Sequence, residues 1–161
     1  MENRKLNRLK DFDYTQENIY FVTTCTNNKI CYFGEIINNK MILNQNGNII
    51  QNQIDWIINQ YKYFVIHHYV IMPNHIHLLC QVKINENMII NTKIKSLSEL
   101  IGAFKTTTSK QIHLAGNKEF RWQRSFHDHI VRNDKSFNFI HNYITNNPLS
   151  WELDKLYNNG L

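Results

Sequence analysis

The sequence predicts an α+β domain, because segments rich in β-branched and aromatic residues alternate with segments in which apolar residues recur at helical spacing. The chain has 161 residues, of which 42% are hydrophobic and 12% aromatic, and this is enough apolar surface for one sizeable core. We therefore expect residues 1–161 to form a single domain.

Strands dominate the first half of the chain. Residues 19–25 are rich in β-forming side chains and bounded by polar residues, which is typical of a buried strand. Residues 40–43 predict a short edge strand, and residues 46–61 carry isoleucines at helical spacing, which predicts an amphipathic helix. Residues 64–71 and 75–82 predict two further strands. The turn between them is so short that we expect the two strands to pair as a hairpin.

The second strand of this hairpin begins with a His-x-His pair. In an extended chain the side chains at i and i+2 share a face, so His75 and His77 project together while Ile76 and Leu78 point to the opposite side. Two imidazoles on one face suit a divalent cation, and Pro73 and Asn74 place the pair at the start of the strand, where functional sites are often built. The alternative is a structural pair of hydrogen-bonded histidines on a wet sheet face.

A helix and a basic, aromatic stretch follow a polar loop at residues 83–95. Ser96 and Glu99 have the spacing of a capping box, and Gly116 is a typical residue beyond the end of a helix. Residues 120–132 interleave arginines with aromatic side chains, which can hold phosphates and stack on bases. In the alternative interpretation, this segment is a surface strand whose side chains pack inward at three positions: Trp122, Phe126 and Ile130.

A second His-x-His pair lies in the same stretch, at His127 and His129. Asp128 lies between the two histidines, and no apolar strand follows them. This pair is therefore the weaker of the two candidate metal sites.

The last predicted helix carries a tyrosine and an asparagine one turn apart. Asn133 can cap this helix, and Pro148 stops it. Because i and i+4 share a helix face, Tyr143 and Asn147 could both reach a metal that the histidines hold. The residue before a proline is biased away from helical geometry, so Asn146 is a competing candidate.

Composition excludes several classes of protein. The three cysteines are odd in number and show no CxxC spacing, which argues against a disulfide framework or a zinc ribbon. No apolar run approaches the roughly 20 residues needed to cross a bilayer, and residues 1–8 lack the apolar core of a signal peptide. We expect a cytoplasmic protein without a membrane partner. The net charge of +5 has the sign that suits a polyanion.

Taken together, these motifs resemble a known family. His75 and His77, with an aliphatic residue between them and residues 143–148 about 65 positions later, resemble the single-tyrosine HUH transposases of the IS200/IS605 type. The similarity is closest to the branch called REP-associated tyrosine transposases. Further stretches that look like this branch are residues 7–14, 20–23, 70–75, 122–124, 128–132 and 146–149.

The resemblance implies a fold and a chemistry. The fold would be a ferredoxin-like, or RRM-like, α+β domain with a central antiparallel sheet flanked by helices, and the whole chain would be one IS200-like transposase domain. Mg²⁺ or Mn²⁺ would be bound by His75, His77 and Asn147. Tyr143 would attack a phosphate of single-stranded DNA and give a 5′-phosphotyrosine and a free 3′-OH.

The resemblance also suggests the substrate, namely single-stranded DNA with hairpin ends, and a nucleoid-associated location. The side chains that we expect near phosphates are Lys105, Arg121, Arg124 and Arg132, whereas Trp122 could stack on a base or belong to the core. The protein would act as a monomer or a homodimer.

Two other functions compete with this hypothesis. HUH nickases of rolling-circle replication and conjugation share the histidine pair but usually have much larger chains. A catalytically silent module that binds single-stranded nucleic acid would keep the basic face without turnover. The presence of His75, His77 and Tyr143 argues against the silent module.

Overall fold

The computed structural model of the protein describes residues 18–84 and 93–159. Residues 7–14, which contribute to the family resemblance, and most of the predicted loop at residues 83–95 lie outside the described residues. None of the described helices is long and apolar enough to cross a membrane.

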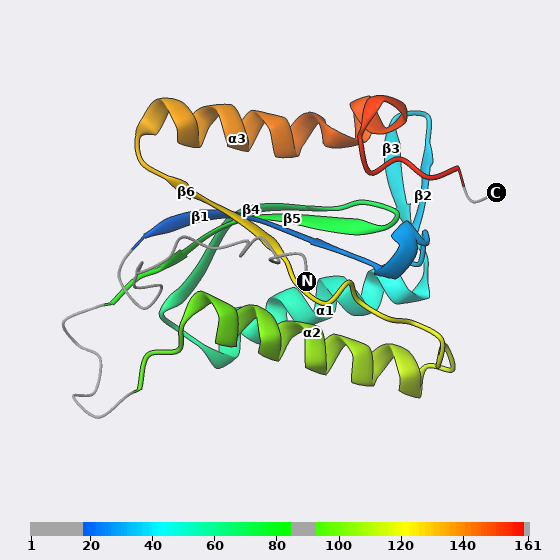
Figure 1. Ribbon diagram of the computed structural model, residues 1–161, viewed down its shortest axis with the longest axis horizontal. Coiled ribbons are helices and arrows are strands. Elements are labelled where there is room, and N and C mark those ends of the chain that lie inside the picture. Colours follow the sequence, from blue (N-terminus) through cyan, green and yellow to red (C-terminus); the bar gives the residue numbers. More distant parts are fainter. Residues whose placement is uncertain (1–17, 85–92, 160–161) are drawn as a thin grey trace, which may run out of the picture.

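The centre of the fold is a four-stranded antiparallel sheet with the strand order β4-β5-β1-β6 (Figure 1). Helices α1 and α2 cover one face of this sheet, and α3 covers the other. The chain order β1–α1–β4–β5–α2–β6 is the ferredoxin-like arrangement, which confirms the predicted fold. The bounds are β1 (Ile19–Cys25), α1 (Gln45–Gln60), β4 (Phe64–Ile71), β5 (His75–Val82), α2 (Leu97–Leu114), β6 (His127–Val131) and α3 (Asp134–Asn146).

A small second sheet lies beside the central one. Residues 40–43 form a strand as predicted, β3 (Lys40–Leu43), but it pairs with β2 (Gly34–Ile37), which the sequence analysis did not predict. Asn38 and Asn39 join these strands with positive φ angles of 49° and 61°, the backbone that a tight two-residue hairpin turn requires. The described residues also form two short 3₁₀ helices, η1 (Asn27–Lys29) and η2 (Asn147–Leu153). Figure 1 shows η2 at the end of α3, close to the small sheet.

Alternation along β5 divides the apolar residues into two cores. Ile76 and Leu78 point into the larger core, between the sheet and helices α1 and α2, together with Tyr20 and Phe104. Leu79 points to the opposite face and packs in a smaller core under α3, whose buried members are Leu79, Val131, Ile140 and Ile144. Because His75 and His77 have the same parity as Leu79, both histidines lie on the sheet face that α3 covers.

Side chains cap the helices where the sequence predicts. The Ser96 side chain accepts a hydrogen bond from the Glu99 backbone N–H, and the Glu99 carboxylate accepts one from the Ser96 backbone N–H, which completes the capping box of α2. The Asn133 side chain accepts from the Ser136 N–H at the start of α3. The Asn133 cap fixes the residue at which α3 begins, and therefore the side of the helix on which Tyr143 lies.

Glycine is required where α1 begins against the loop that precedes β2. A Cβ on Gly47 would overlap the backbone oxygen of Phe33 and would lie 2.9 Å from Leu43 Cδ2, whereas a Cβ on the exposed Gly102 of α2 would meet nothing within 4 Å. We expect Gly47→Ala to lower the free energy of unfolding by about 1–3 kcal/mol through overpacking. Gly102→Ala should raise it by about 0.5–1 kcal/mol through helix propensity. Urea denaturation of the two variants checks both signs, and a stabilising Gly47→Ala would contradict the packing described here.

Candidate functional site

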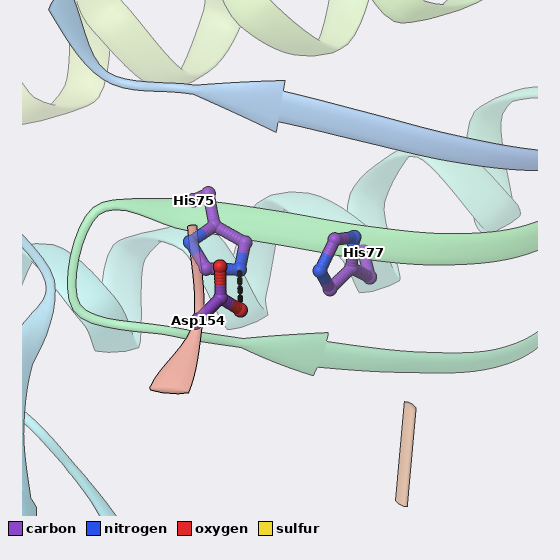
Figure 2. Close-up of side chains that lie close together, drawn as sticks. All are labelled: His75, His77 and Asp154. Carbon is purple, nitrogen blue, oxygen red and sulfur yellow. Dashed lines mark ion pairs between the residues drawn. The ribbon is translucent and has the colours of Figure 1, made fainter. Parts of the chain in front are cut away.

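The candidate site is centred on the two buried histidines of β5 (Figure 2). The side chains of His75 and His77 point from the same side of the strand, with ring centroids 4.6 Å apart and an interplanar angle of 69°. His75 is fully buried and His77 is 4% exposed. Neither Nε2 atom has a hydrogen-bond partner among the described residues. Buried polar atoms are rarely left without partners, so this pair is a candidate ligand site.

The second nitrogen of each imidazole is held by a neighbouring side chain. His75 Nδ1 lies 2.8 Å from Asn74 Oδ1. The Asn74 amide is itself oriented, because its Nδ2 donates to the backbone oxygens of Lys29 and Leu156 at 3.0 and 2.8 Å. An amide oxygen can only accept, so His75 carries its proton on Nδ1 and its lone pair on Nε2. His77 Nδ1 lies 2.7 Å from the Thr23 hydroxyl on β1.

Burial keeps both imidazoles uncharged at neutral pH. It lowers the pKa of His75 to about 4, although the nearby Asp154 carboxylate and the Asn147 side chain act in the opposite direction. The pKa of His77 is also well below its usual value, first because of burial and then because of the proximity of His75 and Lys155. Neutral histidines with a free Nε2 lone pair are the form that binds metal ions.

The structure brings Asn147 to the histidines. Asn147 follows α3 with helical backbone angles (φ −58°, ψ −41°) even though Pro148 comes next, and it is 2% exposed. Its Oδ1 has no hydrogen-bond partner among the described residues, and its Nδ2 donates to Asp154 Oδ2 at 3.5 Å. Asn146, the competing candidate, is exposed.

The sequence analysis missed Asp154, which lies just beyond η2. Its Oδ2 is 3.9 Å from His75 Nε2, and one ligand atom from each of His75, His77 and Asp154 fits within a 4.8 Å group (Figure 2). No motif surrounds Asp154, so the sequence carries no local signal for it. The carboxylate reaches the site because the C-terminal segment folds back over the end of the sheet. There Trp151 is 7% exposed, and its ring centroid lies 6.0 Å from that of His75.

Tyr143 projects from α3 toward the same place. Its ring centroid is 5.4 Å from that of His77 and 6.0 Å from that of Phe21, and the residue is 38% exposed. Partial burial raises the pKa of the Tyr143 hydroxyl, and Asp154 raises it further, whereas the nearby Asn147 side chain lowers it. The phenol is therefore protonated at neutral pH and must lose its proton before or during any nucleophilic attack.

The donor set fits a divalent cation. Two neutral imidazole nitrogens, one amide oxygen and one carboxylate oxygen are typical ligands of Mn²⁺, and the amide and carboxylate oxygens also suit Mg²⁺. Three of these atoms are buried without a hydrogen-bond partner among the described residues: His75 Nε2, His77 Nε2 and Asn147 Oδ1. Leaving such atoms unsatisfied is costly, and a bound cation would satisfy them together.

The second His-x-His pair lacks this environment. The strand register places His127 opposite Thr23 and His129 opposite Phe21, so both share the sheet face of the first pair. Both are exposed, however, and no group of three possible ligands includes them in the part of the chain that the structure describes.

The predicted nucleic-acid contacts occupy different environments. Arg124 and Arg132 are exposed, and Arg121 lines a surface hollow of about 610 Å³ on α2 together with Lys110, His113 and Lys118. Lys105 Nζ donates to the backbone oxygens of Gln123 and Arg124, so it holds the loop before β6. Trp122 is half-buried against the aromatic rings of Phe33, Phe104 and Phe120, which favours a packing role.

Comparisons with known proteins agree with this fold. A protein of Haemophilus influenzae, described as uncharacterized, is 36% identical over 170 aligned residues, which cover 98% of this chain and 94% of the relative. The structure of a REP-associated tyrosine transposase bound to a REP hairpin matches with a TM-score of 0.63 at 19% identity, over 89% of this chain and 73% of that one.

A second solved structure, of a candidate transposase from Deinococcus radiodurans R1, matches with a TM-score of 0.51 at 14% identity, over 86% of this chain and 97% of that one. At these identities the two structures establish the fold. Residues 14–147 match the family described as transposase IS200 like, which is most of the chain. The chain therefore belongs to the family of IS200-like transposases.

Proposed function

We propose that this protein is a metal-dependent single-stranded DNA endonuclease and strand transferase in which Tyr143 is the nucleophile. One observation carries the proposal. Two buried imidazoles with unpartnered Nε2 atoms lie beside a half-exposed tyrosine, with the rings of His77 and Tyr143 5.4 Å apart. Membership of a transposase family supports DNA as the substrate.

The proposed reaction exchanges one phosphate ester for another. The Tyr143 oxygen forms a bond to the scissile phosphorus, and the P–O3′ bond breaks. One piece of the DNA leaves with a free 3′-OH. The other piece stays attached to the protein through its 5′ phosphate, as a 5′-phosphotyrosine. The phenolic proton passes to water or a base, and the leaving 3′ oxygen takes up a proton. Attack by a 3′-OH on the phosphotyrosine reverses the exchange and rejoins DNA, and the tyrosine is then a tolerable leaving group.

His75, His77 and Asn147 are the proposed metal ligands. Mg²⁺ or Mn²⁺ held there would neutralise charge on a non-bridging phosphate oxygen and orient the phosphorus. Asn74 and Thr23 hold the imidazole rings before anything binds, so little rearrangement is needed. The half-exposed Tyr143 ring packs edge-on against both His77 and Phe21, which limits the directions in which its hydroxyl can point.

The proposed substrate is a single strand with a hairpin end. A relative of the same fold was solved with a REP hairpin, which supports this choice. Arg124 and Arg132 are the exposed arginines proposed to contact phosphates, and Arg121 is proposed to contact them from the α2 hollow. Such a substrate would bring the protein to the nucleoid.

Replacement of the nucleophile gives the first test. With Mn²⁺ and hairpin oligonucleotides from the DNA that flanks the gene, the wild type should form a covalent DNA–protein product that resists denaturant. Tyr143→Phe should lower this product by at least about 100-fold, because no other group restores the lost attacking oxygen. Tyr157→Phe is the matched control, since Tyr157 is 40% exposed and Tyr143 38%.

Both remaining outcomes are informative. An adduct that persists in Tyr143→Phe would mean that another side chain is the nucleophile. Hairpin binding by the wild type without any adduct would favour the silent binding module over the enzyme.

The low pKa values of the histidines predict how metal affinity depends on pH. Two ordinary histidines with pKa values near 6.5 would bind Mn²⁺ about 100-fold more weakly at pH 5.5 than at pH 7.5, because protons occupy their nitrogens. Here burial lowers both pKa values, that of His75 to about 4, so protons compete with the metal ion much less between pH 5.5 and pH 7.5. We expect the Mn²⁺ dissociation constant to change less than about 3-fold over this range. Calorimetric titration measures this dissociation constant, and a steep loss of Mn²⁺ affinity at pH 6 would contradict the proposed ligands.

A contact between Arg124 and a phosphate predicts a change in salt dependence. Removing one phosphate contact should flatten the slope of log K against log salt by about 0.7–0.9. Fluorescence anisotropy of a labelled hairpin with Arg124→Ala measures this slope, and Lys62→Ala, at an exposed position beyond α1, is the control. Identical slopes in Arg124→Ala and the wild type would remove Arg124 from the interface.

A further inference from the structure

We infer that Asp154 completes the metal site as an anionic fourth ligand, so that the C-terminal segment, residues 147–158, contributes a ligand to the metal centre through this one side chain. The inference rests on the proposed metal site at His75 and His77. Asp154 lies outside residues 14–147, the part of the chain that matches the family.

The distances favour coordination. One ligand atom from each of His75, His77 and Asp154 lies within 4.8 Å of the others (Figure 2). Asp154 Oδ2 is also 3.5 Å from the Asn147 amide nitrogen. At 3.9 Å, Asp154 Oδ2 and His75 Nε2 are too far apart for a hydrogen bond. Two neighbouring ligands of one cation, each about 2.0–2.2 Å from it, are separated by about 3.0–3.5 Å, so a closure of about 0.5–1 Å would let both atoms bind the same ion.

The carboxylate is aimed at the site by its own backbone. Asp154 Oδ1 accepts a hydrogen bond from the Leu156 N–H at 2.7 Å. The Asp154 N–H donates to the Trp151 carbonyl at 3.0 Å, at the end of η2. These two bonds fix the turn and the side chain, and they leave Oδ2 directed toward His75.

The C-terminal segment is tied to the body of the protein by polar contacts just beyond Asp154. Lys29 Nζ donates to the Lys155 carbonyl at 3.2 Å, and Asn158 Nδ2 donates to the Lys29 carbonyl at 2.8 Å. Asn74 Nδ2 donates to the Leu156 carbonyl at 2.8 Å, while Asn74 Oδ1 holds His75. A single asparagine therefore positions both a histidine and the segment that carries Asp154.

Charge balance also calls for a cation. The Asp154 side chain is 5% exposed, and no lysine or arginine of the described residues lies within ion-pair distance of its carboxylate. A buried carboxylate without a cationic partner is costly. A divalent cation between Oδ2 and the two Nε2 atoms would supply the missing positive charge and would satisfy both nitrogens.

The test uses Mn²⁺ alone, measured by calorimetry on the full chain. Asp154→Asn keeps the shape of the side chain and can keep the hydrogen bond from Leu156, but it removes the negative charge. We expect it to weaken Mn²⁺ binding by at least about 10-fold. Glu152→Gln is the matched control, because it removes an exposed carboxylate from the same segment, and it should change the affinity less than about 2-fold.

A second readout follows the C-terminal segment itself. If Asp154 binds the metal, Mn²⁺ should slow amide hydrogen exchange in residues 147–158 of the wild type and of Glu152→Gln, but not of Asp154→Asn. A thermal melt without metal shows whether Asp154→Asn folds as the wild type does.

The outcomes separate this inference from the proposed function. Wild-type Mn²⁺ affinity in Asp154→Asn, with binding lost in His75→Ala, would overturn the role of Asp154 and leave the histidine site intact. Wild-type affinity in His75→Ala as well would overturn the metal site itself. An Asp154→Asn variant that binds Mn²⁺ normally but forms no adduct would also overturn the inference, and would make Asp154 a candidate base for the Tyr143 proton.

Discussion

The alternation of side chains along β5 is the constraint on which the rest of the structure depends. The strand lies between β4 and β1, and its two faces are covered by helices, one by α1 and α2 and the other by α3. Ile76 and Leu78 are held in the larger core, which forces His75 and His77 onto the face beneath α3. A register shift of one residue would bury the imidazoles among aliphatic side chains and move the core residues to the face beneath α3. The hydrophobic core thereby fixes the position of the polar site.

Much of this could be predicted from the sequence because the relevant patterns are local. The i, i+2 spacing of His75 and His77 fixes their common face, and the i, i+4 spacing of Tyr143 and Asn147 places both at one end of α3. The capping box at Ser96 marked the start of α2 correctly. In each case a few neighbouring residues determine the geometry, so no knowledge of the tertiary fold is needed.

The rest depended on contacts between distant segments. β2 has only four residues and is recognisable through its pairing with β3. Trp122 has the same sequence context whether it stacks on a base or packs on Phe33, and only the folded chain distinguishes these roles. Asp154 reaches His75 because a backbone turn and hydrogen bonds to Lys29 and Asn74 return the C-terminal segment to the sheet. No periodic pattern in the sequence predicts that this segment folds back onto the sheet.

Asp154 would affect both metal binding and the activation of Tyr143 in the proposed chemistry, and its effects on the two would be opposite. Two neutral imidazoles leave the full charge of a bound cation available to a phosphate, whereas a carboxylate ligand holds the cation more firmly but cancels part of that charge. The same carboxylate raises the pKa of Tyr143, which makes its proton harder to remove. A cation between Asp154 and Tyr143 would offset this effect, because positive charge near the phenol stabilises the phenolate. Nucleophile activation and metal occupancy would therefore be coupled through one side chain of the C-terminal segment.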